Sequence, residues 1–98
     1  MPKFIIEREL PGAGGLTLED LHMVSKNTLA ALEELGPEIQ WVESYVTDHK
    51  MYCIYLAPDD TMVREHSARA GLPANRVSRV RRQIAGDAPR PARKTAAV

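Results

Sequence analysis

The segment that most constrains the fold is QWVESYVTDHKMYCIYLAP, at positions 40–58. Two runs rich in aromatic and β-branched residues flank Asp48 and His49, a pattern typical of a β-hairpin with a short turn. If the turn has two residues, strict alternation assigns one sheet face to Trp41, Glu43, Tyr45, Tyr52, Ile54 and Leu56. The opposite face then receives Val42, Ser44, Val46, Met51, Cys53 and Tyr55. Because both faces are substantially apolar, we expect helices to cover one and a partner subunit to cover much of the other.

A strand, a loop and a helix precede this hairpin. Residues 3–9 are predicted to form the strand, and PGAGG at 11–15 interrupts it. The three glycines lack the spacing of a phosphate-binding loop, so we interpret this stretch as a flexible connection. Thr17 is the expected N-cap of a helix that extends to Leu35, where Gly36 and Pro37 end it. The apolar face of this helix consists of Leu21, Val24, Thr28, Ala31, Leu32 and Leu35.

A second helix and a last strand follow the hairpin. Pro58 suits the start of the helix, with Asp59, Asp60 or Thr61 as its cap, and Gly71 ends it. Residues 75–84 are predicted to form an edge strand. The element order βαββαβ, connected by right-handed crossovers, predicts an α+β ferredoxin-like sandwich. In this fold an antiparallel sheet carries two helices on one face.

Length and charge limit the classes of function. The chain has 98 residues, which suits one domain, assigned here to 1–84, followed by a disordered basic tail at 85–98. A single cysteine and the lack of a long apolar run indicate a cytoplasmic protein without a membrane segment. Residues 1–75 have a net charge of −6, and residues 76–98 have +6. No aromatic residue interleaves with the basic residues of the tail, which disfavours nucleic acid as a partner.

His66 is the first candidate for chemistry. It lies on the inward face of the second helix, where a histidine can exchange a proton near neutral pH or bind a metal. The simpler interpretation is a core histidine whose ring is hydrogen-bonded. Cys53 lies in mid-strand without a CxxC motif, which favours a buried structural thiol. No HExxH, CxxC or HxH pattern occurs anywhere in the chain.

A second candidate is an aromatic cleft. Trp41, Tyr45 and Tyr52 are expected to share a face with Glu43, whose carboxylate would need a partner if that face is covered. Such a cleft would suit a small-molecule-binding protein or a cofactor-free enzyme, with Glu43 or His66 as acid or base.

The motifs GLTLEDL at 15–21, MYCIYLAP at 51–58 and REHSARAGLPANRV at 64–77 resemble a family of small bacterial proteins. The family is catalogued as a domain of unknown function and includes a nickel-binding member. The resemblance spans residues 3–84 and implies a ferredoxin-like fold, a homodimer and surface nickel binding linked to sequestration. In nickel-binding members the first strand carries an Asp-x-His type of element, where this chain has Glu7, Arg8 and Glu9. His66 keeps its position, so the resemblance implies Glu7, Glu9 and His66 as ligands of nickel or another divalent metal.

Three hypotheses follow. The first is a homodimeric protein that binds nickel without turnover, and no organic cofactor is indicated. The second is a small-molecule-binding protein or cofactor-free enzyme. The third is a regulatory module whose basic tail binds nucleic acid. The surroundings of His66 separate the first two: exposure beside carboxylates favours a metal site, whereas burial beside an apolar pocket favours a small-molecule site.

Overall fold

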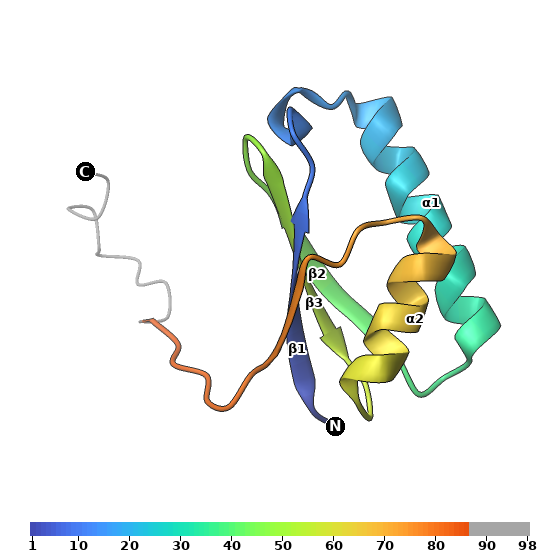
Figure 1. Cartoon of the computed structure of the whole chain (residues 1–98), viewed down its shortest axis with the longest axis vertical. Coiled ribbons are helices and arrows are strands. Elements are labelled where there is room, and N and C mark those ends of the chain that lie inside the picture. Colours follow the sequence, from blue (N-terminus) through green and yellow to red (C-terminus); the bar gives the residue numbers. More distant parts are fainter. Residues whose placement is uncertain (87–98) are drawn as a thin grey trace, which may run out of the picture.

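The sheet has four antiparallel strands in the order β2-β3-β1-β4. The computed structural model describes residues 1–86. The strands are β1 (Lys3–Glu9), β2 (Gln40–Val46), β3 (Lys50–Leu56) and β4 (Arg76–Arg79). The helices α1 (Leu18–Leu35) and α2 (Asp60–Ala70) both lie on one face of the sheet, and no helix of the described residues covers the other face (Figure 1). This arrangement confirms the predicted ferredoxin-like fold.

The core lies between the sheet and the two helices. Alternate residues of β1 and β3 point into it: Phe4, Ile6, Met51, Cys53 and Tyr55 are all buried. The helices contribute Ala31, Val63 and Ala70. Because strand side chains alternate between faces, the intervening residues of β1 and β3 point to the uncovered side.

The helix ends follow the predicted signals. Thr17 caps α1 in a capping box, in which its hydroxyl accepts from the Asp20 N–H and the Asp20 carboxylate accepts from the Thr17 N–H. Asp59 is the N-cap of α2, where its carboxylate accepts from the Met62 N–H at 2.9 Å. Gly71 ends α2 in the left-handed conformation, with φ of 73°.

Three local expectations were wrong. The connection at residues 11–15 contains a 3₁₀ turn, η1 (Ala13–Gly15), whose Gly14 N–H donates to the Asp48 carbonyl at 3.0 Å. The last strand ends at Arg79 instead of residue 84. It pairs antiparallel with β1, which begins at Lys3, so the last backbone bond to β1 is the one from the Val80 N–H to the Lys3 carbonyl. A β-bulge interrupts the alternation of β2 between Trp41 and Glu43.

The bulge changes which face Trp41 occupies. Trp41 pairs with Tyr55 on the helix side, whereas Glu43 pairs with Ile54 on the uncovered side. Val42 is the additional residue, and its side chain is exposed. A bulge of this kind shifts the faces of the residues before it by one position.

Within residues 1–86, neither helix is long and apolar enough to span a membrane. The expected disorder of the tail concerns residues 85–98, of which 87–98 lie outside the described part of the chain.

Candidate functional site

A cavity of about 210 Å³ lies between α1 and the sheet. Helix α1 contributes Leu21, Val24, Ser25 and Thr28 to its wall. The sheet contributes Trp41, Ser44, Val46, Met51 and Cys53, and Leu72 lies at its edge after α2. Ser25 and Thr28 on the helix and Ser44 and Cys53 on the sheet all have small side chains, which leaves this part of the layer unfilled. The wall is largely apolar with a few polar groups, which is the usual composition of a small-molecule site.

A chain of hydrogen bonds runs along the sheet wall of this cavity. The Trp41 indole N–H donates to Ser44 Oγ at 2.9 Å, and the Ser44 hydroxyl donates to Cys53 Sγ at 3.0 Å. The bulge in β2 makes this chain possible, because it turns Trp41 to the face that carries Ser44 and Cys53. The thiol of Cys53 is buried, as the sequence predicted.

Arg8 is fully buried and lies next to Cys53. Its Nε donates to Cys53 Sγ at 3.3 Å, and its Nη1 donates to Ser67 Oγ at 2.9 Å and to the Pro73 carbonyl at 2.8 Å. Its Nη2 makes a long contact of 3.5 Å with the Tyr55 hydroxyl. A buried guanidinium has a desolvation cost of several kcal/mol by order of magnitude. Its position in the core therefore needs a reason beyond packing.

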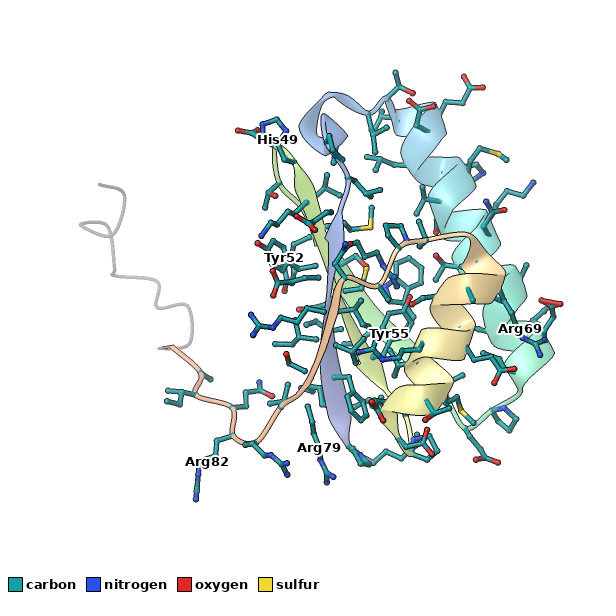
Figure 2. All side chains as sticks on the ribbon, in the orientation of Figure 1. His49, Tyr52, Tyr55, Arg69, Arg79 and Arg82 are labelled. Atoms are coloured by element: carbon teal, nitrogen blue, oxygen red, sulfur yellow. The ribbon has the colours of Figure 1, made fainter. Side chains whose placement is uncertain are left out.

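His66 is fully buried beside this cluster. Its Nε2 lies 3.1 Å from the Thr28 carbonyl, which can only accept, so Nε2 carries the proton. The ring packs at a tilt against Tyr55, with centroids 4.9 Å apart (Tyr55 is labelled in Figure 2). Within the described structure Nδ1 has no hydrogen-bond partner. Burial lowers the pKa of His66 below its ordinary value. The hydrogen bond to Thr28 raises this pKa, and the nearby Arg8 charge lowers it. The net shift is downward, so the ring is neutral at pH 7.

The residues expected to hold nickel are not brought together. Glu7 and Glu9 alternate with the inward-facing Ile6 and Arg8, so they project from the sheet face opposite to His66. Glu7 instead pairs with Lys50, at 3.4 Å between Nζ and Oε1. Among residues 1–86 no group of three or more His, Cys, Asp or Glu side chains is placed to hold a metal ion. Within residues 1–86 of one chain, the three ligands that the family resemblance implies are therefore not placed together.

The predicted aromatic cleft is divided between the two faces of the sheet. Tyr45 and Tyr52 pair across β2 and β3 on the uncovered face, and the Tyr45 hydroxyl donates to the Glu43 carboxylate. That hydrogen bond raises the pKa of Tyr45. Figure 2 shows Tyr52 and Tyr55 on opposite sides of the sheet. Trp41 lies on the Tyr55 side, so it lines the cavity beneath α1 instead of the expected cleft.

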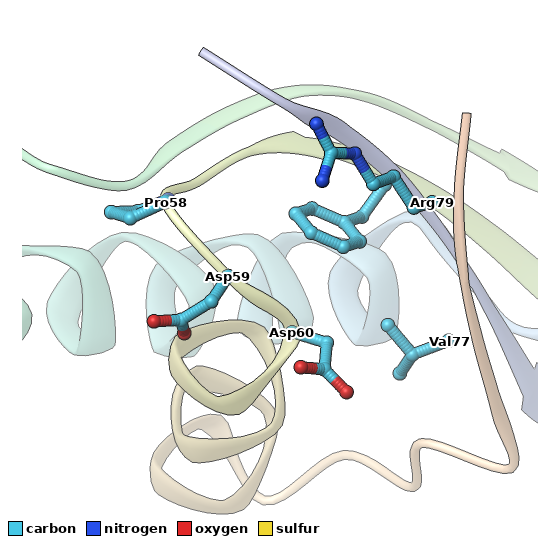
Figure 3. Close-up of a pocket in the computed structure, with 6 residues that line it drawn as sticks. Pro58, Asp59, Asp60, Val77 and Arg79 are labelled. Carbon is cyan, nitrogen blue, oxygen red and sulfur yellow. The ribbon is translucent and has the colours of Figure 1, made fainter. Parts of the chain in front are cut away.

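Two further hollows lie away from this cluster. A groove of about 360 Å³ on the uncovered face is bounded by residues that include Ile5, Tyr45, Ile54, Val80 and Ile84. A hollow of about 240 Å³ lies at the start of α2, and Asp60 and Arg79 both border it (Figure 3). Asp59, which also borders this hollow, is already engaged as the cap of α2.

The burial of Arg8 was not predicted, because this residue stands between two glutamates and resembles a solvated charge. A signal was nevertheless present. Alternation along the first strand places Arg8 on the same face as Phe4 and Ile6, which are two of its three apolar residues. A cation in register with core residues predicts a buried charge that needs a partner.

The chain is a small ferredoxin-like α+β protein with a cavity of about 210 Å³ beside a buried cysteine and arginine. The family model described as "Nickel responsive protein SCO4226-like" matches residues 4–80, and the chain belongs to this family. The expected family resemblance is thereby confirmed. The chain is also similar to the crystal structure of SCO4226 from Streptomyces coelicolor A3(2), with a TM-score of 0.71 and 20% identity. That similarity covers 84% of this chain and 99% of the other, and it supports the fold. No curated protein matches the chain.

Proposed function

We propose that this member of the nickel-responsive family binds a small, largely apolar molecule in the cavity between α1 and the sheet. The observation that carries the proposal is the cavity itself, which opens beside the buried core histidine. Thr28 connects the two: its side chain lines the cavity, and its carbonyl accepts from His66. Burial beside an apolar pocket is the arrangement that favours a small-molecule site over a metal site.

The size and composition of the cavity suit such a ligand. An apolar cavity of about 150 Å³ engineered into another protein binds benzene. The cavity here measures about 210 Å³, and Leu21, Val24 and Met51 supply apolar contacts. Ser25 and Ser44 offer hydroxyl groups that can orient a ligand with one polar end. A ligand that fills this space would gain the burial of apolar surface as its main source of affinity.

Trp41 provides a direct test because it is the single tryptophan of the chain and lines the cavity. Titration with toluene, used as the probe, should change the emission of Trp41 in a saturable manner and raise the melting temperature. Ser25→Phe should abolish both effects, because the ring would occupy the cavity from α1. Asn27→Phe is the matched control, since Asn27 is exposed on the same helix. An unchanged Trp41 emission, or equal binding by both variants, would refute the proposal.

Nickel binding is the second candidate, and membership of the nickel-responsive family favours it. Within one chain the carboxylates of Glu7 and Glu9 share the uncovered face of the sheet, beside apolar groups such as Ile5. We infer that a second copy would cover this face, which would bring two pairs of carboxylates into one assembly. Carboxylate oxygens are acceptable nickel ligands. Because the two pairs come from two copies of the chain, the metal would be bound by the homodimer.

Native mass spectrometry with added nickel tests this candidate. The expected result is a dimer with bound nickel, whose metal is lost in the Glu7→Gln/Glu9→Gln double variant. Glu33→Gln, an exposed change on α1, should leave binding unchanged. Nickel bound by a monomer, or retained by the double variant, would contradict the assignment.

A further inference from the structure

Two hydroxyl groups on opposite walls of the cavity beneath α1 have already used their protons. On the helix side, the Thr28 hydroxyl donates to the Val24 carbonyl at 2.8 Å. On the sheet side, the Ser44 hydroxyl donates to Cys53 Sγ at 3.0 Å, and its oxygen accepts from the Trp41 indole N–H. A hydroxyl group has one proton and two lone pairs, so both oxygens can make a further hydrogen bond only as acceptors. A bound molecule can therefore satisfy them only with a donor of its own.

Of these two acceptors, Thr28 Oγ has the larger free capacity. Thr28 is only 3% exposed, so its oxygen has little access to water. Within residues 1–86 this oxygen accepts no hydrogen bond, whereas Ser44 Oγ already accepts one. A donor that enters the cavity would supply a bond that this buried oxygen lacks.

The charge next to the cavity excludes a cationic donor. The fully buried Arg8 lies 3.3 Å from Cys53 Sγ, measured from its Nε, and contacts no carboxylate in the described structure. Burial raises the pKa of Tyr55 to about 12, so the phenol beside Arg8 is neutral as well. An ammonium group brought into the cavity would face an uncompensated guanidinium, and like charges repel strongly where the dielectric constant is low.

The walls also exclude an anionic ligand. A buried carboxylate or phenolate needs several hydrogen-bond donors. The Arg8 guanidinium is not part of the wall, and no other cationic side chain of the described residues lines the cavity. Ser25 contributes the one further hydroxyl. A neutral O–H group meets these conditions, because it can donate to Thr28 Oγ and accept from Ser25.

The remaining wall residues favour an aromatic ring as the body of the ligand. Trp41 and the Met51 thioether belong to the sheet side, and both indole rings and thioether sulfur make favourable contacts with aromatic groups. Leu21 and Val24 supply apolar surface from α1. The volume of about 210 Å³ exceeds that of a cavity of about 150 Å³ that binds benzene, so a single ring with a small substituent fits.

We propose that the cavity binds neutral single-ring phenols, whose hydroxyl donates to Thr28 Oγ. The inference rests on the proposed binding function of the cavity and names the class of its ligand. In a cavity without an acceptor, the phenol hydroxyl would lose its bonds to water, and a hydrocarbon of the same shape would bind more tightly. The acceptor at Thr28 removes this penalty, while the apolar walls supply the affinity.

Titrations with phenol and with toluene test this assignment, because the two molecules have nearly the same shape and only phenol has a donor. The indole N–H signal of Trp41 in ¹H–¹⁵N spectra reports binding. The wild type should bind phenol at least as tightly as toluene. Thr28→Val removes the acceptor but keeps the shape of the side chain and the carbonyl that accepts from His66. This variant should bind phenol about tenfold more weakly and toluene within about twofold of the wild type.

Thr28→Ser is the matched control, because it keeps the hydroxyl and removes only a methyl group. It should keep the wild-type ratio of the two dissociation constants, and the same spectra show whether each variant is folded. If the wild type binds toluene but binds phenol tenfold or more weakly, the phenol assignment is overturned and the binding function stands. The wild-type ratio in Thr28→Val would overturn it too. If neither probe binds the wild type, the binding function fails and the phenol assignment falls with it.

Discussion

At the scale of single residues, the core departs from the usual pattern at two side chains. A guanidinium and an imidazole are both fully buried, although neither has a carboxylate as a hydrogen-bond partner in the described structure. Arg8 faces the sulfur of Cys53, and His66 is neutral with an unpartnered Nδ1. A polar group placed in a core without full compensation needs an explanation, which can be structural or functional. Both residues lie next to the cavity wall formed by Thr28 and Cys53.

The lowered pKa of His66 makes stability depend on pH. Burial depresses its pKa in the folded protein below the ordinary value of 6.5, so the unfolded chain takes up the proton first as the pH falls. Stability should therefore fall as the pH drops below about 6.5, with a slope of up to about 1.4 kcal/mol per pH unit from this one residue.

Urea unfolding at pH 7.5, 6.5, 6.0 and 5.5 (roughly spanning this range) measures the slope. His66→Gln should flatten it, since the glutamine amide can still donate to the Thr28 carbonyl but does not titrate. His22→Gln is the control, because His22 is exposed on α1. A slope that is the same in His66→Gln and in the wild type would rule out the neutral buried histidine.

The residue scale also shows the limits of the sequence pattern. The inward position of His66 could be predicted from helical spacing, because its neighbours Val63 and Ala70 lie on the same apolar face. The hydrogen bond from His66 to the Thr28 carbonyl could not be predicted, because this bond joins two helices and depends on how they pack. For a similar reason the sequence pattern does not show that Glu7 and His66 lie on opposite sides of the sheet. Their joint role as metal ligands stays a prediction.

At the scale of secondary-structure elements, most boundaries follow local signals, and the exceptions depend on tertiary contacts. The caps Thr17, Asp59 and Gly71 lie where their residue types predict. The bulge at Val42 has no local signal, because an extra residue in one strand is defined only against its partner strand. That one residue decides whether Trp41 lines the cavity or the opposite face.

The loop before α1 makes a tertiary contact with the hairpin turn that the sequence pattern does not predict. A Cβ atom at Gly14 would lie 2.9 Å from the Cα atom of Asp48, so this loop packs closely on the hairpin turn. Gly14→Ala should therefore destabilise the protein by about 1–3 kcal/mol, as expected for a side chain forced into a packed site.

Gly15→Ala provides the matched comparison, since a Cβ atom at Gly15 has no heavy atom within 4 Å. Thermal unfolding of both variants should show a lower melting temperature for Gly14→Ala and little change for Gly15→Ala. Equal melting temperatures would mean that the loop does not pack on the turn in solution.

At the scale of the whole molecule, the two faces of the sheet are assigned different roles. The covered face contains the cavity, Cys53 and the buried Arg8. The uncovered face presents Ile5 and Tyr45, which are 37% and 54% exposed, together with the Glu7 and Glu9 carboxylates. The layered architecture could be predicted from the order of elements, because βαββαβ leaves few topologies once crossovers are right-handed. We propose ligand binding on the covered face and association with a second copy on the other.

A single NMR titration tests this division of roles most directly. The indole N–H of Trp41 gives one resolved signal in a ¹H–¹⁵N spectrum, because the chain has one tryptophan. Toluene should shift this signal and the amides of the other residues that line the cavity, while nickel should broaden signals of the uncovered face, around Glu7 and Glu9, most strongly. A Trp41 signal that toluene leaves in place, or that nickel broadens before any other, would contradict the assignment of the cavity as the ligand site.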